Sequence, residues 1–167
     1  MRTILLLIAS LFFLTACSHT YYVVRHAEKA VPAEGPVMNT PNDPPLSTLG
    51  QQRAVALKEL LHDKNIHYIY STNTIRTKST AEPLRAMLGL QTQIYGPMPD
   101  SSFMLQLKQL KKNTLIVGHS NTIDDIANAL AGEQKVDGDL PESVYDQVFI
   151  IHYKRGGKKI SFERVSY

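Results

Sequence analysis

The sequence predicts an α/β fold, a three-layer sandwich with a mostly parallel central sheet and a C-terminal antiparallel hairpin. Two patterns predict it. Short apolar runs alternate along the chain with segments whose apolar residues recur at helical spacing, and this alternation is typical of strand–helix units that build a parallel sheet. Two last apolar runs, 147–153 and 159–165, flank Gly156 and Gly157 and leave no room for a helix between them, so we expect a hairpin that adds antiparallel strands.

Each element follows from local signals. Ser47 or Thr48 can cap the first helix, and Asn121 or Ser120 can cap the last. Gly89 is expected to end the second helix, 74–88. The expected strands are 21–24, 66–70, 91–95 and 114–118, and the expected helices are 48–61, 74–88, 103–110 and 122–130. The side chains expected to face inward from the first two helices are Leu49, Ala54, Leu57, Leu61, Ile75, Ala81, Leu84 and Leu88.

Two expected strands end in a histidine. Tyr21 to Val24 lead directly into Arg25 and His26, and the run from Thr114 leads through Gly118, read as a residue that allows a tight turn, into His119. Ligands of open α/β sheets bind beyond the carboxyl ends of strands. Imidazole can act as a nucleophile and arginine offers a planar fork of donors for phosphate oxygens. Each histidine alone could be a packed or a surface residue, but the pair predicts a phosphoryl site.

The motifs resemble those of the histidine phosphatase superfamily, the phosphoglycerate mutase-like proteins. The similar segments are, in the family's order, Val24–Glu28, Pro45–Ala54, Tyr70–Ala81 and Val117–Ser120. The resemblance extends from about Tyr21 to the end of the chain. It implies a phosphatase that hydrolyses phosphomonoesters through a phosphohistidine on His26, without a metal or other cofactor.

The resemblance also assigns roles to further residues. Arg25, Arg76 and His119 would hold the phosphoryl oxygens, with Arg76 in the first turn of a helix, where anions bind favourably. Ala27 stands where the family usually has glycine, and the family's asparagine after the histidine has no counterpart. Lys29 could replace that asparagine or could be a solvated lysine.

The proton donor for the leaving oxygen has two candidates. Asp100 follows the strand 91–95, roughly where some family members carry an acid, and Glu28 lies two residues past His26. Asp100 could equally be a helix N-cap, because Ser101 and Ser102 follow it before a helix. The segment 30–45, rich in proline, could form a wall or lid of the site or be a surface insertion.

The N-terminus resembles a bacterial lipoprotein signal. Arg2 precedes an apolar run, Ile4 to Leu14, that is too short to span a bilayer but suits a signal peptide. Leu14–Cys17 resembles a lipobox, so we expect residues 1–16 to be removed, residues 17–20 to be a lipidated tether on Cys17, and residues 21–167 to form the phosphatase-like domain. An ordinary signal peptide or an uncleaved anchor are the alternatives. The implied location is the cell envelope, on the periplasmic face of the outer membrane.

Composition limits the function classes. The 167 residues are 43% hydrophobic and 20% charged, as in a globular domain, and the net charge of +3 is too small to indicate nucleic-acid binding. The single cysteine excludes an internal disulfide and a cysteine-rich zinc site. The expected ligand is a phosphorylated small molecule or an envelope glycan. The alternatives are phosphoglycerate mutase activity, or a membrane-anchored lipoprotein that binds phosphorylated ligands or a partner without catalysis.

Overall fold

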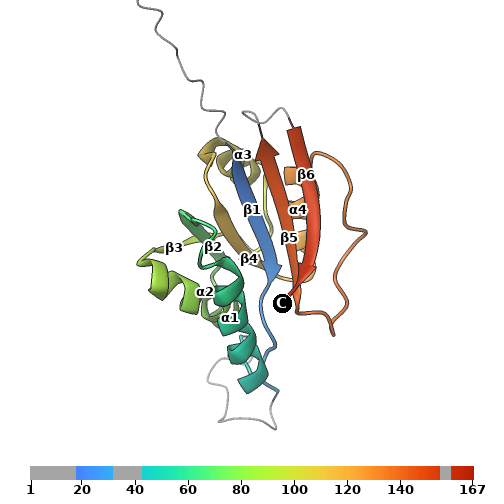
Figure 1. Cartoon of the computed structure of the whole chain (residues 1–167). Coiled ribbons are helices and arrows are strands. Elements are labelled where there is room, and N and C mark those ends of the chain that lie inside the picture. Colours follow the sequence, from blue (N-terminus) through green and yellow to red (C-terminus); the bar gives the residue numbers. More distant parts are fainter. Residues whose placement is uncertain (1–17, 32–42, 155–158) are drawn as a thin grey trace, which may run out of the picture.

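The computed structural model describes residues 18–31, 43–154 and 159–167, and these form one six-stranded mixed sheet with helices on both faces (Figure 1). The strand order is β3-β2-β4-β1-β5-β6. The strands are β1 (His19–Arg25), β2 (Tyr68–Thr72), β3 (Thr92–Tyr95), β4 (Thr114–Gly118), β5 (Gln147–Lys154) and β6 (Lys159–Ser166), and the helices are α1 (Thr48–Leu61), α2 (Ile75–Leu88), α3 (Ser101–Leu110) and α4 (Ile123–Ala131).

The pairing confirms the predicted sheet. The first four strands pair in parallel, whereas β5 runs antiparallel to both β1 and β6. The tip of the hairpin, including Gly156 and Gly157, lies outside the described residues. Residues 19 and 20 had been expected in a tether, but they belong to β1 and are buried, because His19 and Thr20 continue the pairing with β5.

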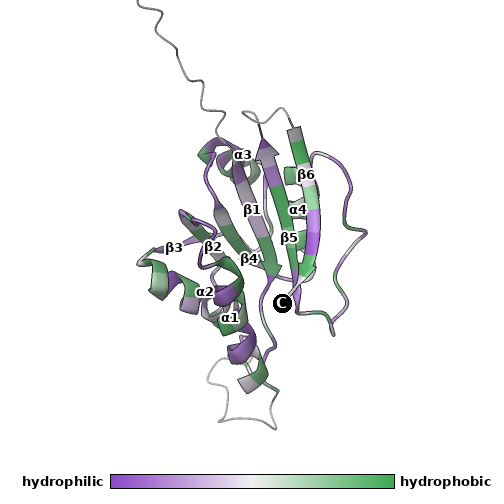
Figure 2. Ribbon diagram, in the orientation of Figure 1, coloured by the Kyte–Doolittle hydropathy of each residue, from purple (hydrophilic) through white to green (hydrophobic). Residues whose placement is uncertain are grey.

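Two apolar layers hold the helices on the sheet. On one face, Leu57, Leu61 and Leu84 of α1 and α2 pack against Leu115 and Val117 of β4. On the other face, the residues that pack together are Phe103 and Leu107 of α3, Ile126 and Leu130 of α4, and Tyr21, Val23 and Phe149 of the sheet. Figure 1 shows α1 and α2 in front of the sheet and α3 and α4 behind it. Figure 2 shows hydrophilic and hydrophobic residues alternating along α1 and α2, as the helical spacing requires.

Two residues expected to face inward are exposed. Leu49 is 55% exposed and Ile75 is 37% exposed. At the start of α1 the buried position belongs to Gly50, where a Cβ atom would lie 2.2 Å from the main-chain oxygen of Glu28. The glycine therefore lets α1 lie directly against the segment that follows β1, and its neighbour Leu49 points outward. Ile75 stands at the solvent-facing start of α2.

The caps agree in part with the expected ones. Ser47 caps α1 by accepting from the amide of Gly50, and Gly89 ends α2 with a positive φ of 65°. The expectation that Asn121 or Ser120 caps the last helix is wrong, because the N-cap position of α4 belongs to Thr122 and carries no side-chain cap. Its hydroxyl instead contacts the main chain of His119. None of the helices within the described residues is long and apolar enough to cross a bilayer.

Candidate active site

The topology brings the two strand-end histidines together. β1 and β4 are neighbours, Arg25 pairs with Gly118, and the amide of His26 donates to the main-chain oxygen of Gly118 at 2.9 Å. The chain then leaves β1 towards α1 on one face and leaves β4 towards α4 on the other. This is a topological switch point, where open α/β sheets bind their ligands. The rings of His26 and His119 lie 5.4 Å apart between centroids, edge to face.

Gly118 serves this arrangement through its size. A Cβ atom at Gly118 would lie 2.6 Å from the hydroxyl oxygen of Tyr95 and 2.9 Å from a side-chain carbon of Ile123. Its backbone does not adopt the left-handed conformation. The glycine therefore provides space for β3 and α4 to close around the strand end, where the sequence had suggested a tight turn.

A hydrogen bond determines the tautomer of His26. Nδ1 lies 2.8 Å from the main-chain oxygen of Ala27, and a carbonyl can only accept, so Nδ1 carries the proton. The lone pair of a neutral ring is then on Nε2. Burial lowers the pKa of His26 to about 3, with further lowering from the charges of Arg76 and Arg25 and an opposing contribution from the Ala27 bond. At neutral pH the ring is therefore uncharged, as a nucleophile must be.

His119 is oriented by a chain of threonines. Its Nε2 lies 2.9 Å from Oγ1 of Thr72, and this hydroxyl donates to Oγ1 of Thr77, so Thr72 accepts the Nε2 proton of His119. Nδ1 of His119 then faces Nη2 of Arg76 at 3.5 Å. Burial, and then the charges of Arg76 and Arg25, lower the pKa of His119 to about 4. The two histidines and two arginines thus share one electrostatic environment.

Arg76 is held by an acid that the sequence did not reveal. Asp43 forms an ion pair with Nη1 of Arg76 at 3.0 Å, and both its oxygens accept from the amide of Ile75 at the start of α2. Asp43 precedes the motif at Pro45 in sequence but meets α2 only in the folded chain, so no local signal marks it. Bridging the helix start and Arg76, the carboxylate orients this guanidinium towards His119.

Arg25 contacts the segment between α4 and β5. Its Nη1 donates to the main-chain oxygens of Pro141, Glu142 and Val144, and its guanidinium lies over the Tyr145 ring at 4.1 Å. The ring of Tyr145 also lies 6.0 Å from that of His26. The sequence had assigned this segment no role, because turns and lone polar residues carry no periodic signal. It forms one side of the site.

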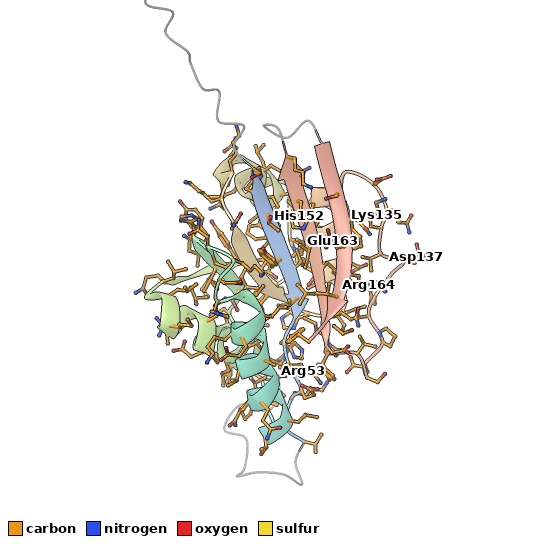
Figure 3. All side chains as sticks on the ribbon, in the orientation of Figure 1. Arg53, Lys135, Asp137, His152, Glu163 and Arg164 are labelled. Carbon is orange, nitrogen blue, oxygen red and sulfur yellow. The ribbon has the colours of Figure 1, made fainter. Side chains whose placement is uncertain are left out.

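Lys29 and Glu28 point to different partners. Lys29 lies 3.5 Å from the carboxylate of Glu142, which also pairs with Arg25. Glu28 is paired with Arg53 of α1, whose Nη1 donates to the main-chain oxygen of Tyr167. Figure 3 labels Arg53 on α1, near the end of β1, and Figure 1 shows the C-terminal end there too. Lys29 and Arg25 therefore share the carboxylate of Glu142, and Glu28 is engaged in an ion pair with α1.

The geometry of Asp100 is that of a helix cap. It occupies the N-cap position of α3, and Oδ1 accepts from the amide of Phe103 and the hydroxyl of Ser102. These bonds lower the pKa of Asp100, whereas a proton donor needs its proton. Asp124, in the first turn of α4, is only 6% exposed, and burial raises its pKa. Its Oδ1 has no hydrogen-bond partner among the described residues. The acid role of Asp100 and Glu28 remains a prediction.

The two ends of the segment 30–45 come together beside the site. The amide of Ala30 donates to Pro45, and Lys29 forms an isolated bridge with Leu46. Residues 32–42 of the expected wall or lid lie outside the described residues. Within the described residues, no cluster of three or more histidine, cysteine or acidic side chains could hold a metal ion. The positive charges that lower the pKa of both histidines come from Arg76 and Arg25, and the charge of Asp43 opposes them at His119.

Comparison with known proteins points to a family. Residues 21–98 match the family model described as histidine phosphatase superfamily (branch 1), and this stretch contains His26 and Arg76. Over these residues the chain is similar to the histidine phosphatase superfamily. The similarity supports the expected enzyme class, a phosphatase of the histidine type. No curated protein sequence matches the chain significantly.

Solved structures with the same fold match most of the chain. The protein histidine phosphatase SixA in complex with tungstate is 15% identical, with a TM-score of 0.67 over 88% of this chain and 96% of that one. A mycobacterial glucosyl-3-phosphoglycerate phosphatase with inorganic phosphate is 14% identical, with a TM-score of 0.63 over 89% and 96%. YhfR of Bacillus stearothermophilus is 19% identical, with a TM-score of 0.60 over 89% and 96%. These likenesses confirm the predicted fold class.

Proposed function

We propose that the protein hydrolyses phosphomonoesters through a phosphohistidine on His26, with side chains rather than a metal ion balancing the charge. One observation carries the proposal. The bond from Nδ1 to the Ala27 carbonyl leaves the lone pair on Nε2 of an uncharged imidazole, and Arg76, Arg25 and His119 surround that ring closely enough to perturb its pKa. A neutral nucleophile among cationic groups is what attack on a dianionic phosphoryl group requires.

The reaction has two steps. In the first, Nε2 of His26 attacks phosphorus, the bond from phosphorus to the leaving oxygen breaks, and that oxygen takes up a proton. The Ala27 carbonyl stabilises the positive charge that develops on the ring through Nδ1–H. In the second, water attacks phosphorus, the bond from nitrogen to phosphorus breaks, and phosphate and neutral His26 are released.

The cationic groups stabilise the transferring phosphoryl oxygens. Arg76, turned towards the site by Asp43, and Arg25, in the residue before the nucleophile, supply charge and N–H donors. Burial and the charges of Arg76 and Arg25 lower the pKa of His119, and an anion bound beside the ring opposes this lowering. The ring therefore gains a proton as the ligand binds and becomes a third donor. Phosphoryl transfer depends mostly on such positioning and electrostatic stabilisation.

The proposed substrate is a phosphorylated small molecule or an envelope glycan. Two structural neighbours are named as a protein histidine phosphatase and a glucosyl-3-phosphoglycerate phosphatase, so phosphohistidine and sugar phosphates belong in a substrate screen. We also propose a lipid anchor on Cys17. It is supported by the lipobox-like Leu14–Cys17 and by the start of β1 at His19, two residues later. The anchored domain would then lie at a membrane surface of the cell envelope.

Trapping the intermediate tests the mechanism. Wild-type protein quenched in acid during turnover of a labelled phosphomonoester is expected to carry acid-labile, base-stable phosphate, and His26→Ala is expected to lose both this label and the activity. His67→Ala, which removes an exposed histidine whose only described bond is made by its main-chain amide, is the control and should keep both. Full activity in a folded His26→Ala protein would refute the mechanism. Activity that EDTA abolishes and zinc or magnesium restores would indicate a metal-dependent reaction.

A further inference from the structure

The guanidinium of Arg25 already has several partners within the protein. Nη1 donates to three carbonyls of the segment 141–144, at 2.9, 3.2 and 3.0 Å. One face of the guanidinium is covered by the ring of Tyr145. The side chain is 2% exposed, so this arrangement is part of the buried structure. A phosphoryl group can therefore reach Arg25 only through Nη2 and through Nε, which is buried and has no hydrogen-bond partner among the described residues.

Glu142 occupies the first of these two donors. Its Oε2 lies 3.2 Å from Nη2 of Arg25 and 3.5 Å from Nζ of Lys29. Arg25 cannot move without breaking its carbonyl contacts, whereas the Glu142 side chain is 71% exposed and turns freely into solvent. Arg25 and Lys29, on either side of His26 in the sequence, are thus both paired with the carboxylate of Glu142, which can turn away into solvent.

We propose that Glu142 is a specificity-determining residue, whose carboxylate competes with the phosphoryl group for Nη2 of Arg25 and then remains beside the bound substrate as a negative charge. The inference rests on the proposed function. Its first consequence is weak retention of inorganic phosphate, because an anion that binds Nη2 of Arg25 must displace the carboxylate. Its second consequence is discrimination among leaving groups. A second negative charge near the phosphate is repelled, and an amine there is attracted.

Neutralising this one carboxylate tests the competition. Glu142→Gln is expected to lower the inhibition constants of inorganic phosphate and vanadate by about fivefold, the range of a partly exposed ion pair. The difference should shrink at about 1 M salt, where charges are screened within roughly 3 Å. Glu133→Gln is the matched control. Glu133 lies in the same connection between α4 and β5, is 66% exposed and pairs with Lys135, and its loss should leave both constants unchanged.

Two matched substrates test the discrimination. Phosphoethanolamine and phosphoglycolate differ in carrying an amine or a carboxylate near the phosphate. Wild type is expected to prefer the amine in kcat/KM, and Glu142→Gln to reduce that preference by about fivefold. A loss of packing alone would change both substrates equally. Unchanged inhibition constants in Glu142→Gln, or an unchanged preference, would overturn the inference while leaving the phosphatase function standing. Wild type that neither hydrolyses phosphoesters nor binds vanadate would overturn both.

Discussion

The amide of Ala27 donates a hydrogen bond of 2.9 Å to Oγ1 of Thr80, a fully buried residue of α2. The same hydroxyl donates to the main-chain oxygen of Arg76 at 2.8 Å. One oxygen therefore connects the turn that carries His26 to the helix turn that carries Arg76. Because these are the proposed nucleophile and a proposed phosphate ligand, we expect Thr80 to act as a positioning residue.

Removing this oxygen should misplace His26. Thr80→Val keeps the shape but leaves the Ala27 amide buried without an acceptor, which costs about 1–3 kcal/mol. We expect lower stability and a fall in kcat that exceeds the rise in KM, because orientation of the nucleophile matters most in the transition state. Thr80→Ser retains the oxygen and should restore most of both. Equal kinetics in Val and Ser variants would contradict the positioning role.

Arg76 and His119 should contribute to transition-state binding. Arg76→Ala and His119→Ala are each expected to lower kcat by roughly 10²–10³-fold, as loss of one oxyanion donor does, and to weaken vanadate inhibition. Arg85→Ala, which removes a pair with Glu82 on the outside of the same helix, is the control and should change neither. If vanadate inhibits both site variants as it does wild type, the assignment of these ligands is wrong.

The buried histidines should make stability fall in mild acid. The pKa values of His26 and His119 are about 3 and about 4 in the folded protein, and about 6.5 when unfolded. Below about pH 6.5 the unfolded chain binds protons that the folded chain does not, so the free energy of unfolding decreases as pH falls through that window. We expect His26→Asn to lose less stability than wild type between about pH 7.5 and about pH 5 in urea titrations. His62→Asn, at an exposed position, should behave as wild type, and an unchanged slope in His26→Asn would refute the linkage.

Leaving-group dependence will decide the proton donor. An alkyl phosphate needs protonation of its leaving oxygen far more than an aryl phosphate does. Because asparagine caps helices as well as aspartate, Asp100→Asn should keep the start of α3 intact and test the acid role alone. If Asp100 is the acid, the variant should lose far more rate on the alkyl than on the aryl substrate, whereas retention of both rates would leave Asp100 as a helix cap only. The same comparison with Glu28→Gln and Asp124→Asn tests whether the ion-paired carboxyl of Glu28 or the buried carboxyl of Asp124 is the proton donor.

The lipid anchor makes a separate prediction from the sequence. Cys17→Ser should remove the acceptor of the lipid, so the protein should leave the membrane fraction or accumulate unprocessed. Ser18→Ala, next to it, should remain attached. Membrane attachment and processing that are unchanged in Cys17→Ser would exclude the lipobox interpretation.

Local signals were sufficient to predict most elements and the strand ends that carry the two candidate histidines. Apolar runs, a capping serine at Ser47 and a terminating glycine at Gly89 act over a few residues, so the chain order alone predicted strands, helices and the two strand ends that carry His26 and His119. Motifs with fixed spacing added Arg25 and Arg76. Burial was less predictable, as Leu49 shows, because a helix's inward face depends on what it packs against.

Contacts between distant segments were decided only by the tertiary structure. Asp43 reaches Arg76 across the chain, and Glu142 reaches Arg25 from beyond α4, and neither acid lies in a motif that spacing could detect. Asp100 had two interpretations of equal local merit, and its place at the start of α3 decided its contacts. The protonation states of His26 and His119 follow from burial and from the charges of Arg76 and Arg25, and of these contacts only the one between Arg25 and His26 is local in sequence. Electrostatic environment is a property of the folded surroundings, so no short stretch of sequence contains it.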